Sequence, residues 1–117
     1  MSKKDLQREI RQKEGMIVSE ATLLNFDLLD SFWGIMEGYN LKTPIKKDIK
    51  NILNNYTEEE INYPLNISEE LADHISWLIN EDCFNYLNDI APKKFYFGSQ
   101  EGDGACFGFW KIEEEDY

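Results

Sequence analysis

Residues 95–112, FYFGSQEGDGACFGFWKI, decide the fold of this chain. Two runs rich in aromatic residues flank the segment 99–104, which is rich in glycine and acidic residues. Aromatic residues favour strands, and a glycine-rich turn between two such runs is typical of a β-hairpin. Glycine tolerates a positive φ, so we expect Gly102 or Gly104 to make the turn.

A long helix is predicted immediately before the hairpin. Ser68 is a suitable N-cap, the helix dipole favours Glu69 and Glu70 in the first turn, and Pro92 ends the helix. Apolar residues at three- and four-residue steps form its expected core stripe. These residues are Leu71, Ile75, Leu78, Ile79, Tyr86, Leu87 and Ile90.

Two further helices are predicted upstream. The first covers about residues 20–39, with Ser19 as its N-cap. The second begins at Thr43 and Pro44, an N-cap followed by proline at the first helical position. The inward-facing residues are Leu24, Leu28, Phe32, Ile35 and Tyr39 in the first helix and Ile45, Ile49, Ile52, Leu53 and Tyr56 in the second. The outward-facing residues of the second helix include Lys46, Lys47 and Lys50.

The chain has the length of one domain, and we expect an α+β fold with three main helices packed on a small antiparallel sheet or hairpin at the C-terminus. Residues 16–112 form this single domain. Residues 1–15 are predicted to be a charged helix or arm, with Leu6 and Ile10 as its apolar residues. Residues 113–117 are predicted to be a solvated acidic tail.

Two connecting segments are less regular. Residues 16–18 are either a brief strand or the entry to the next helix. Residues 57–67 contain an acidic run, a proline and two asparagines, which is typical of a connection. We expect Tyr63, Leu65 and Ile67 to pack back on the core.

The composition excludes several classes of protein. No apolar run approaches the roughly 20 residues of a membrane span, and residues 1–15 hold no stretch suited to a signal peptide. We therefore expect a cytoplasmic protein with no membrane partner. Cys83 and Cys106 lack the spacing of metal ligands and are interpreted as small apolar core residues in a reducing compartment.

No arrangement of residues predicts catalysis or a cofactor. The only histidine, His74, stands next to Asp73, which does not face it on a helix, and one histidine does not make a multi-histidine metal site. Nothing around the cysteines indicates a lowered thiol pKa. Glu101 and Asp103 offer two carboxylates, fewer than a calcium loop supplies. We expect no enzyme activity, no cofactor and no metal.

Charge is the strongest functional signal. The net charge is −11, and residues 57–117 carry three Lys or Arg against fifteen Asp or Glu, whereas residues 1–56 are nearly balanced. Such a field repels nucleic acid and favours basic partners. The candidate partner-binding residues are Glu58, Glu59, Glu60, Glu69, Glu70, Asp73, Glu81, Asp82, Glu101 and Asp103. Two interpretations remain open: these acids resemble the phosphates of nucleic acid to a basic cleft, or they only solvate the surface.

Part of the C-terminal region resembles a segment of short proteins of phages and other mobile elements. Residues 87–92, LNDIAP, are followed by YFG at 96–98 and by GDGACFGFW at 102–110. The resemblance implies a structural module and no catalytic residue. In size and charge, such proteins are similar to anti-CRISPR and anti-restriction inhibitors.

The functional prediction is a small acidic inhibitor of a host nucleic-acid-targeting defence complex, binding the basic nucleic-acid cleft of a CRISPR effector or restriction nuclease as a DNA mimic. The partner is then a host protein or ribonucleoprotein, and the chain does not bind nucleic acid directly. The alternative is a non-catalytic structural or adaptor module of a mobile element, whose contacts come from exposed aromatic residues such as Trp33, Trp77 or Trp110.

Overall fold

The protein has an α+β fold, as predicted. The computed structural model describes residues 2–63, 65 and 67–112. Its elements are α1 (Lys3–Lys13), β1 (Gly15–Ser19), α2 (Asn25–Gly38), α3 (Pro44–Asn55), α4 (Glu58–Asn62), α5 (Glu69–Trp77), the π-helical segment η1 (Leu78–Cys83), α6 (Phe84–Ile90), β2 (Phe95–Gln100) and β3 (Asp103–Lys111). None of the helices in these residues combines the length and apolar composition that crossing a membrane demands.

The predicted hairpin forms two strands of a three-stranded antiparallel sheet. β3 is the central strand, between β1 and β2. Gly102 has a φ of +83° and makes the turn. The segment at residues 16–18, for which two interpretations were open, is a strand, because it pairs with β3 from Gly15 opposite Trp110 to Ser19 opposite Phe107.

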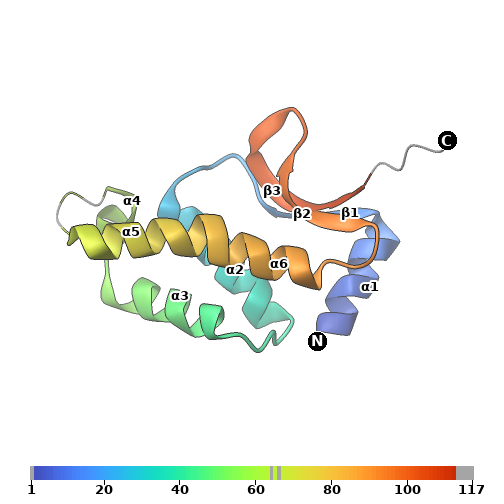
Figure 1. The fold of residues 1–117 in the computed structure, drawn as a ribbon, viewed down its shortest axis with the longest axis horizontal. Coiled ribbons are helices and arrows are strands. Elements are labelled where there is room, and N and C mark those ends of the chain that lie inside the picture. Colours follow the sequence, from blue (N-terminus) through green and yellow to red (C-terminus); the bar gives the residue numbers. More distant parts are fainter. Residues whose placement is uncertain (1, 64, 66, 113–117) are drawn as a thin grey trace.

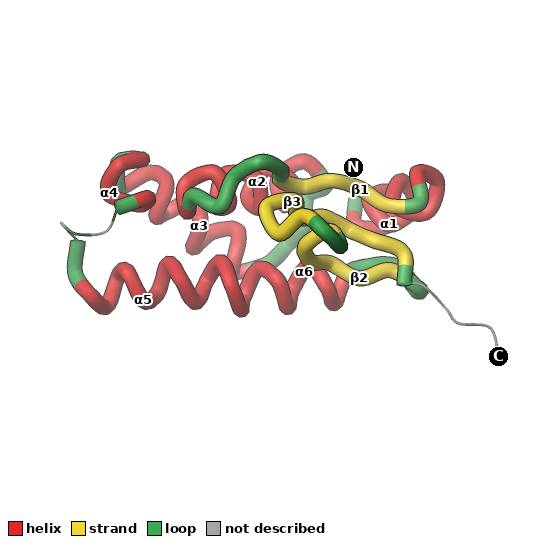
Figure 2. The backbone as a smooth tube through the Cα atoms, turned by 90° about the horizontal axis from the view of Figure 1, so that it is seen from above, coloured by secondary structure: helices red, strands yellow, loops and turns green. Residues whose placement is uncertain are grey.

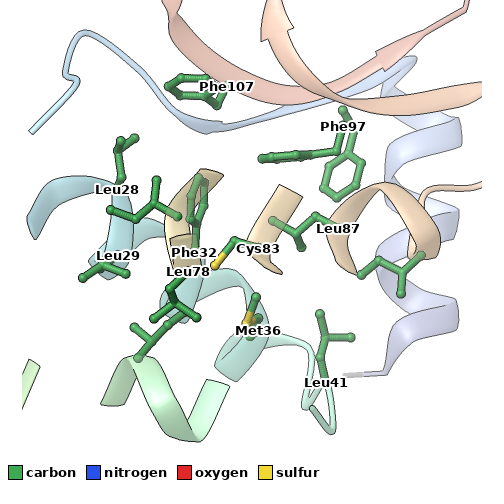
Figure 3. Close-up of a cluster of buried hydrophobic side chains, with 14 of the residues drawn as sticks. Leu28, Leu29, Phe32, Met36, Leu41, Leu78, Cys83, Leu87, Phe97 and Phe107 are labelled. Atoms are coloured by element: carbon green, nitrogen blue, oxygen red, sulfur yellow. The ribbon is translucent and has the colours of Figure 1, made fainter. Parts of the chain in front are cut away.

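The core lies between the sheet and the helices. Figure 1 shows the sheet over one side of the helical layer, and in Figure 3 Phe97 and Phe107 extend from the sheet towards Phe32 and Leu87. The Phe97 ring meets Phe32 and Phe84 edge to face, with centroids 5.8 and 5.1 Å apart. Edge-to-face contacts of this kind add to the stability gained by burying the rings.

One long helix runs along the molecule, formed without interruption by α5, η1 and α6 (Figures 1 and 2). The Ser68 cap is confirmed, since its hydroxyl accepts from the Leu71 N–H at 3.1 Å, and the helix ends at Ile90, before Pro92. The seven residues of the predicted core stripe are buried or half-buried, as expected. The π-helical turn holds one extra residue, and Cys83, interpreted from the sequence as a core residue, is buried at its end.

The start of α2 corrects the prediction. The helix begins at Asn25, and Ser19 is the last residue of β1 instead of its N-cap. Pairing of β1 with β3 keeps the chain extended through Ser19, so the helix starts later. Leu24, predicted to face inward, is the N-cap residue and is 41% exposed. The cap of α3 is confirmed, because Thr43 accepts from the Ile45 N–H.

The N-terminal helix packs on the rest of the fold. Leu6 and Ile10 of α1 are fully buried in the core, and Ser2 and Asp5 form a capping box at its start. The Gln7 side-chain amide donates to the carbonyl of Ile90 at 2.8 Å, which joins α1 to the end of α6.

The connection at residues 57–67 contains a short helix, α4, with a capping box of Thr57 and Glu60. Ile67 is half-buried against the core, as predicted, but Tyr63 is 60% exposed and Leu65 is 93% exposed. The prediction that these two residues pack on the core was therefore wrong, and Ile61 of α4 is the buried residue of this connection. The predicted acidic tail, residues 113–117, lies outside the described residues.

Candidate partner-binding surface

His74 has a partner that the sequence did not indicate. Its Nε2 lies 2.8 Å from Oδ2 of Asp48, so that the pair links α5 to α3 at the surface. Asp48 is distant in sequence, and only the packing of the two helices brings it close. In the part of the chain that the structure describes, no three His, Cys, Asp or Glu residues lie close enough to hold a metal ion together.

Both cysteines are buried and unpaired, and the interpretation of Cys83 and Cys106 as small core residues is confirmed. Burial raises the pKa of the Cys83 thiol to about 12, and the charges of Asp82 and Asp48 add to this effect. Burial also raises the pKa of Cys106. Both thiols are therefore protonated near neutral pH, which is the less nucleophilic form.

Acidic residues occupy the first turns of α4 and α5. Glu58, Glu59 and Glu60 begin α4, and Glu69 and Glu70 begin α5. Negative charge is favoured there by the exposed backbone N–H groups and the helix dipole. Figures 1 and 2 place both helix starts at the same end of the molecule.

The exposed side of α5 combines acids with an aromatic residue. Glu70, Asp73, Trp77 and Glu81 follow one another at steps of three or four residues, so they share one side of the long helix, opposite the buried Ile75. Trp77 is 60% exposed. We call these four exposed residues the α5 face.

The stretch of chain that contains the α5 face has no basic residue to offset its negative charge. Residues 51–92 contain no Lys or Arg, whereas they hold nine Asp or Glu. None of the three ion pairs found in residues 2–63, 65 and 67–112 involves Glu70, Asp73 or Glu81. The carboxylates of the α5 face are therefore available to an external cation.

A small hollow lies beside α4. Its volume is about 210 Å³, and Glu59, Glu60, Tyr63 and Leu65 line it. Glu60 accepts from the backbone N–H of Thr57 at 2.9 Å and so also holds the helix start in place. Acidic and exposed apolar groups thus meet at this end of the molecule as well.

The remaining predicted residues lie elsewhere. Glu101 lies in the β2–β3 turn and Asp103 is the first residue of β3, in the hairpin that projects from the sheet (Figure 1). Asp103 accepts from the Ala105 N–H at 3.1 Å within that hairpin. Asp82 is half-buried in η1. The ten predicted acids therefore do not form one continuous row, and the structure brings together only those of α4 and α5, with Glu81 of η1 on the same side of the long helix.

The sequence reasoning did not include Tyr63 and Leu65 in the surface. Their exposure depends on how α4 docks on α2, through bonds from Asn25 to the Ile61 carbonyl and from the Phe26 N–H to Asn62. Trp77 was named from the sequence only as a contact of the alternative function, although its spacing of four residues from Asp73 and from Glu81 already places it on the same helix side as these acids.

Comparison of the chain with protein-family models, with curated proteins and with solved structures finds no match.

Proposed function

We propose that the protein acts by binding a partner protein that has a basic surface, with the α5 face as the contact. The supporting observation is Trp77, largely exposed on a helix side whose other members are Glu70, Asp73 and Glu81. Protein interfaces commonly have an aromatic residue at the centre and polar groups around it. The acids select a partner rich in Lys or Arg and speed the encounter.

The partner class that best fits this charge is a nucleic-acid-targeting defence complex, and the protein is its inhibitor. Proteins that bind DNA or RNA hold the phosphates with Lys and Arg, and the α5 face offers carboxylates over about 16 Å of helix, from Glu70 to Glu81. A chain docked in this way occupies the basic cleft in place of nucleic acid. The proposed setting is the cytoplasm of a bacterial host cell.

A charge-reversal experiment tests this function. Tagged wild-type protein, the variant E70K/D73K/E81K and the control E20K/D30K/E101K are used to capture partners from a lysate that contains CRISPR and restriction complexes. The control changes the net charge equally at exposed positions outside the α5 face. We expect the wild type and the control to retain a basic nuclease subunit at low salt, and the α5 variant to lose it.

The captured complex is then assayed for DNA cleavage with and without the protein. Inhibition by the wild type and the control, but not by the α5 variant, is the expected result. Capture and inhibition by the α5 variant at the wild-type level contradict the proposal.

A second candidate function is an adaptor module that binds through apolar contacts. It is favoured by the exposure of Tyr63, Leu65 and Trp77. Binding of this kind persists at high salt, because apolar contacts are not screened, whereas charge-led binding weakens steeply. A partner that remains bound to E70K/D73K/E81K at high salt, and is lost from W77A, identifies the adaptor.

A further inference from the structure

A hollow between α2 and the start of α3 is rich in basic residues, in a molecule whose net charge is −11. Its volume is about 560 Å³, within the range of about 300–1,000 Å³ that small-molecule sites occupy. Four of its lining residues are lysines, and Trp33 and Glu37 of α2 line it as well. We call this hollow, lined by Lys42, Lys46, Lys47, Lys50, Trp33 and Glu37, the lysine groove.

The lysines of the groove are mostly uncompensated. Lys46 pairs with Glu37 at 2.8 Å, but no carboxylate of the described residues lies within ion-pair distance of Lys42, Lys47 or Lys50. Lys46 and Lys50 are four residues apart on α3, where like charges repel each other. An anion in the groove relieves this repulsion.

Trp33 adds an aromatic surface beside the positive charges. The Lys50 ammonium lies 4.3 Å from the centre of the Trp33 ring. A ligand that carries both a flat ring and anionic groups matches this combination. Thr43, the N-cap of α3, also lines the groove, so the positive end of that helix dipole opens to it.

A second hollow of about 500 Å³ adjoins the first, because Lys47 and Lys50 line both. Asn51 and Asn54 line this second hollow and offer amide donors. Asp48 lines it as well, and its carboxylate lies 2.8 Å from Nε2 of His74. The two hollows together give room for a ligand with several polar groups.

We propose that the lysine groove binds an organic polyphosphate, a molecule with two or more phosphoryl groups beside a flat ring, such as a nucleoside diphosphate. The lysine ammonium groups bind the phosphoryl oxygens through charge-assisted hydrogen bonds, and Trp33 contacts the ring. This site is distinct from the α5 face and does not depend on the function proposed for it.

Calorimetric titration at low ionic strength tests the site with three probes: ADP, pyrophosphate and adenosine. We expect ADP to bind more tightly than pyrophosphate, which lacks the ring, and than adenosine, which lacks the phosphates. The variant K42A/K47A is expected to weaken ADP binding at least tenfold. The variant W33L is expected to weaken ADP binding while leaving pyrophosphate binding unchanged.

The matched control is K3A/K4A, which removes the same charge from exposed positions on α1. It is expected to bind ADP as the wild type does, and so is E70K/D73K/E81K, which separates this site from the partner surface. The proposal is overturned by any of three results: no binding of ADP at millimolar concentration, equal weakening in K42A/K47A and K3A/K4A, or equal affinity for ADP and pyrophosphate. Lys42 and Lys47 are exposed, so their replacement does not disturb the core.

Discussion

Gly108 shows how a single missing side chain allows the sheet to form. It lies opposite Ile17 in the β1–β3 pair, and a Cβ atom at this position would lie 2.2 Å from the carbonyl oxygen of Met16. That atom belongs to the backbone and does not move without shifting β1. The strand pairing therefore requires glycine at this position.

The variant G108A is expected to lower the free energy of unfolding by about 2 kcal/mol or more, because the strands must separate to admit the methyl group. Urea denaturation measures the change. G104A is the matched control, since a Cβ there meets nothing within 4 Å, and its effect should stay below about 1 kcal/mol. Equal effects of the two variants would contradict this account of Gly108.

The Cys83 thiol is predicted to make stability depend on alkaline pH. Its pKa is raised from an ordinary value of about 9 to about 12 in the folded protein. Below pH 9 the thiol is protonated in both states, so stability does not change. As the pH rises above 9, only the unfolded state loses the proton, and the free energy of unfolding falls by at most about 1.4 kcal/mol per unit and per thiol.

Urea denaturation between pH 9 and 10 checks this expectation. Tyr39, whose pKa is raised from an ordinary value of 10 to about 12, and Tyr86, whose pKa burial also raises, contribute to the same fall towards pH 10. The variants are therefore compared with the wild type over the whole window. The slope of stability against pH should be smaller in C83A than in the wild type. Because the pKa of Cys106 is also raised, it should be smallest in C83A/C106A. An unchanged slope in the double variant would show that other groups cause the fall.

At the scale of elements, the helix boundaries that depend on neighbouring residues were predicted correctly from the sequence. Thr43 with Pro44, Ser68 and Pro92 marked helix boundaries correctly, because caps and proline act on neighbouring backbone. The start of α2 was wrong because Ser19 is held by pairing with a strand far along the chain. The residues next to Ser19 in the sequence do not indicate that it pairs with β3.

The long helix shows a second limit of prediction from the sequence. A regular helical period was assumed across residues 68–91, whereas the structure has a π-helical turn at Leu78–Cys83 that adds one residue to that period. The acids of α5 were nevertheless assigned to the exposed side, because the period is regular before η1. The lysine groove was predicted only as outward lysines of α3, since its hollow depends on how α2 and α3 pack.

The exposed side of α5 yields a prediction for Trp77. The variant W77A is expected to raise the Kd for the captured partner at least about thirtyfold, which corresponds to the loss of about 2 kcal/mol typical of an interface hot spot. Because Trp77 is 60% exposed, the free energy of unfolding should change by less than about 0.5 kcal/mol. Surface-based binding assays and urea denaturation measure the two quantities, and unchanged affinity would remove Trp77 from the interface.

Over the whole molecule, net charge is predicted to limit stability. A charge of −11 causes self-repulsion in the compact state. Raising NaCl to about 0.15 M shortens the Debye length to about 8 Å and should raise the unfolding midpoint in urea. The variant E70K/D73K/E81K, with less negative charge to screen, should gain less from the same salt. Equal gains would indicate a salt effect unrelated to these carboxylates.

The central position of β3 in the sheet has a consequence during synthesis of the chain. β1, which contains Ile17, has no strand to pair with until Gly108 of β3 has been synthesised. Ribosomes add about 5–20 residues per second, so this interval is on the order of 5–20 s. Throughout it, the core cluster that contains Leu6 and Ile10 is incomplete, because Phe107 and Phe109 of β3 belong to it. We therefore expect ribosome-associated chaperones to bind the region around α1 and β1 during synthesis. The sheet is completed only when β3 has left the exit tunnel of the ribosome.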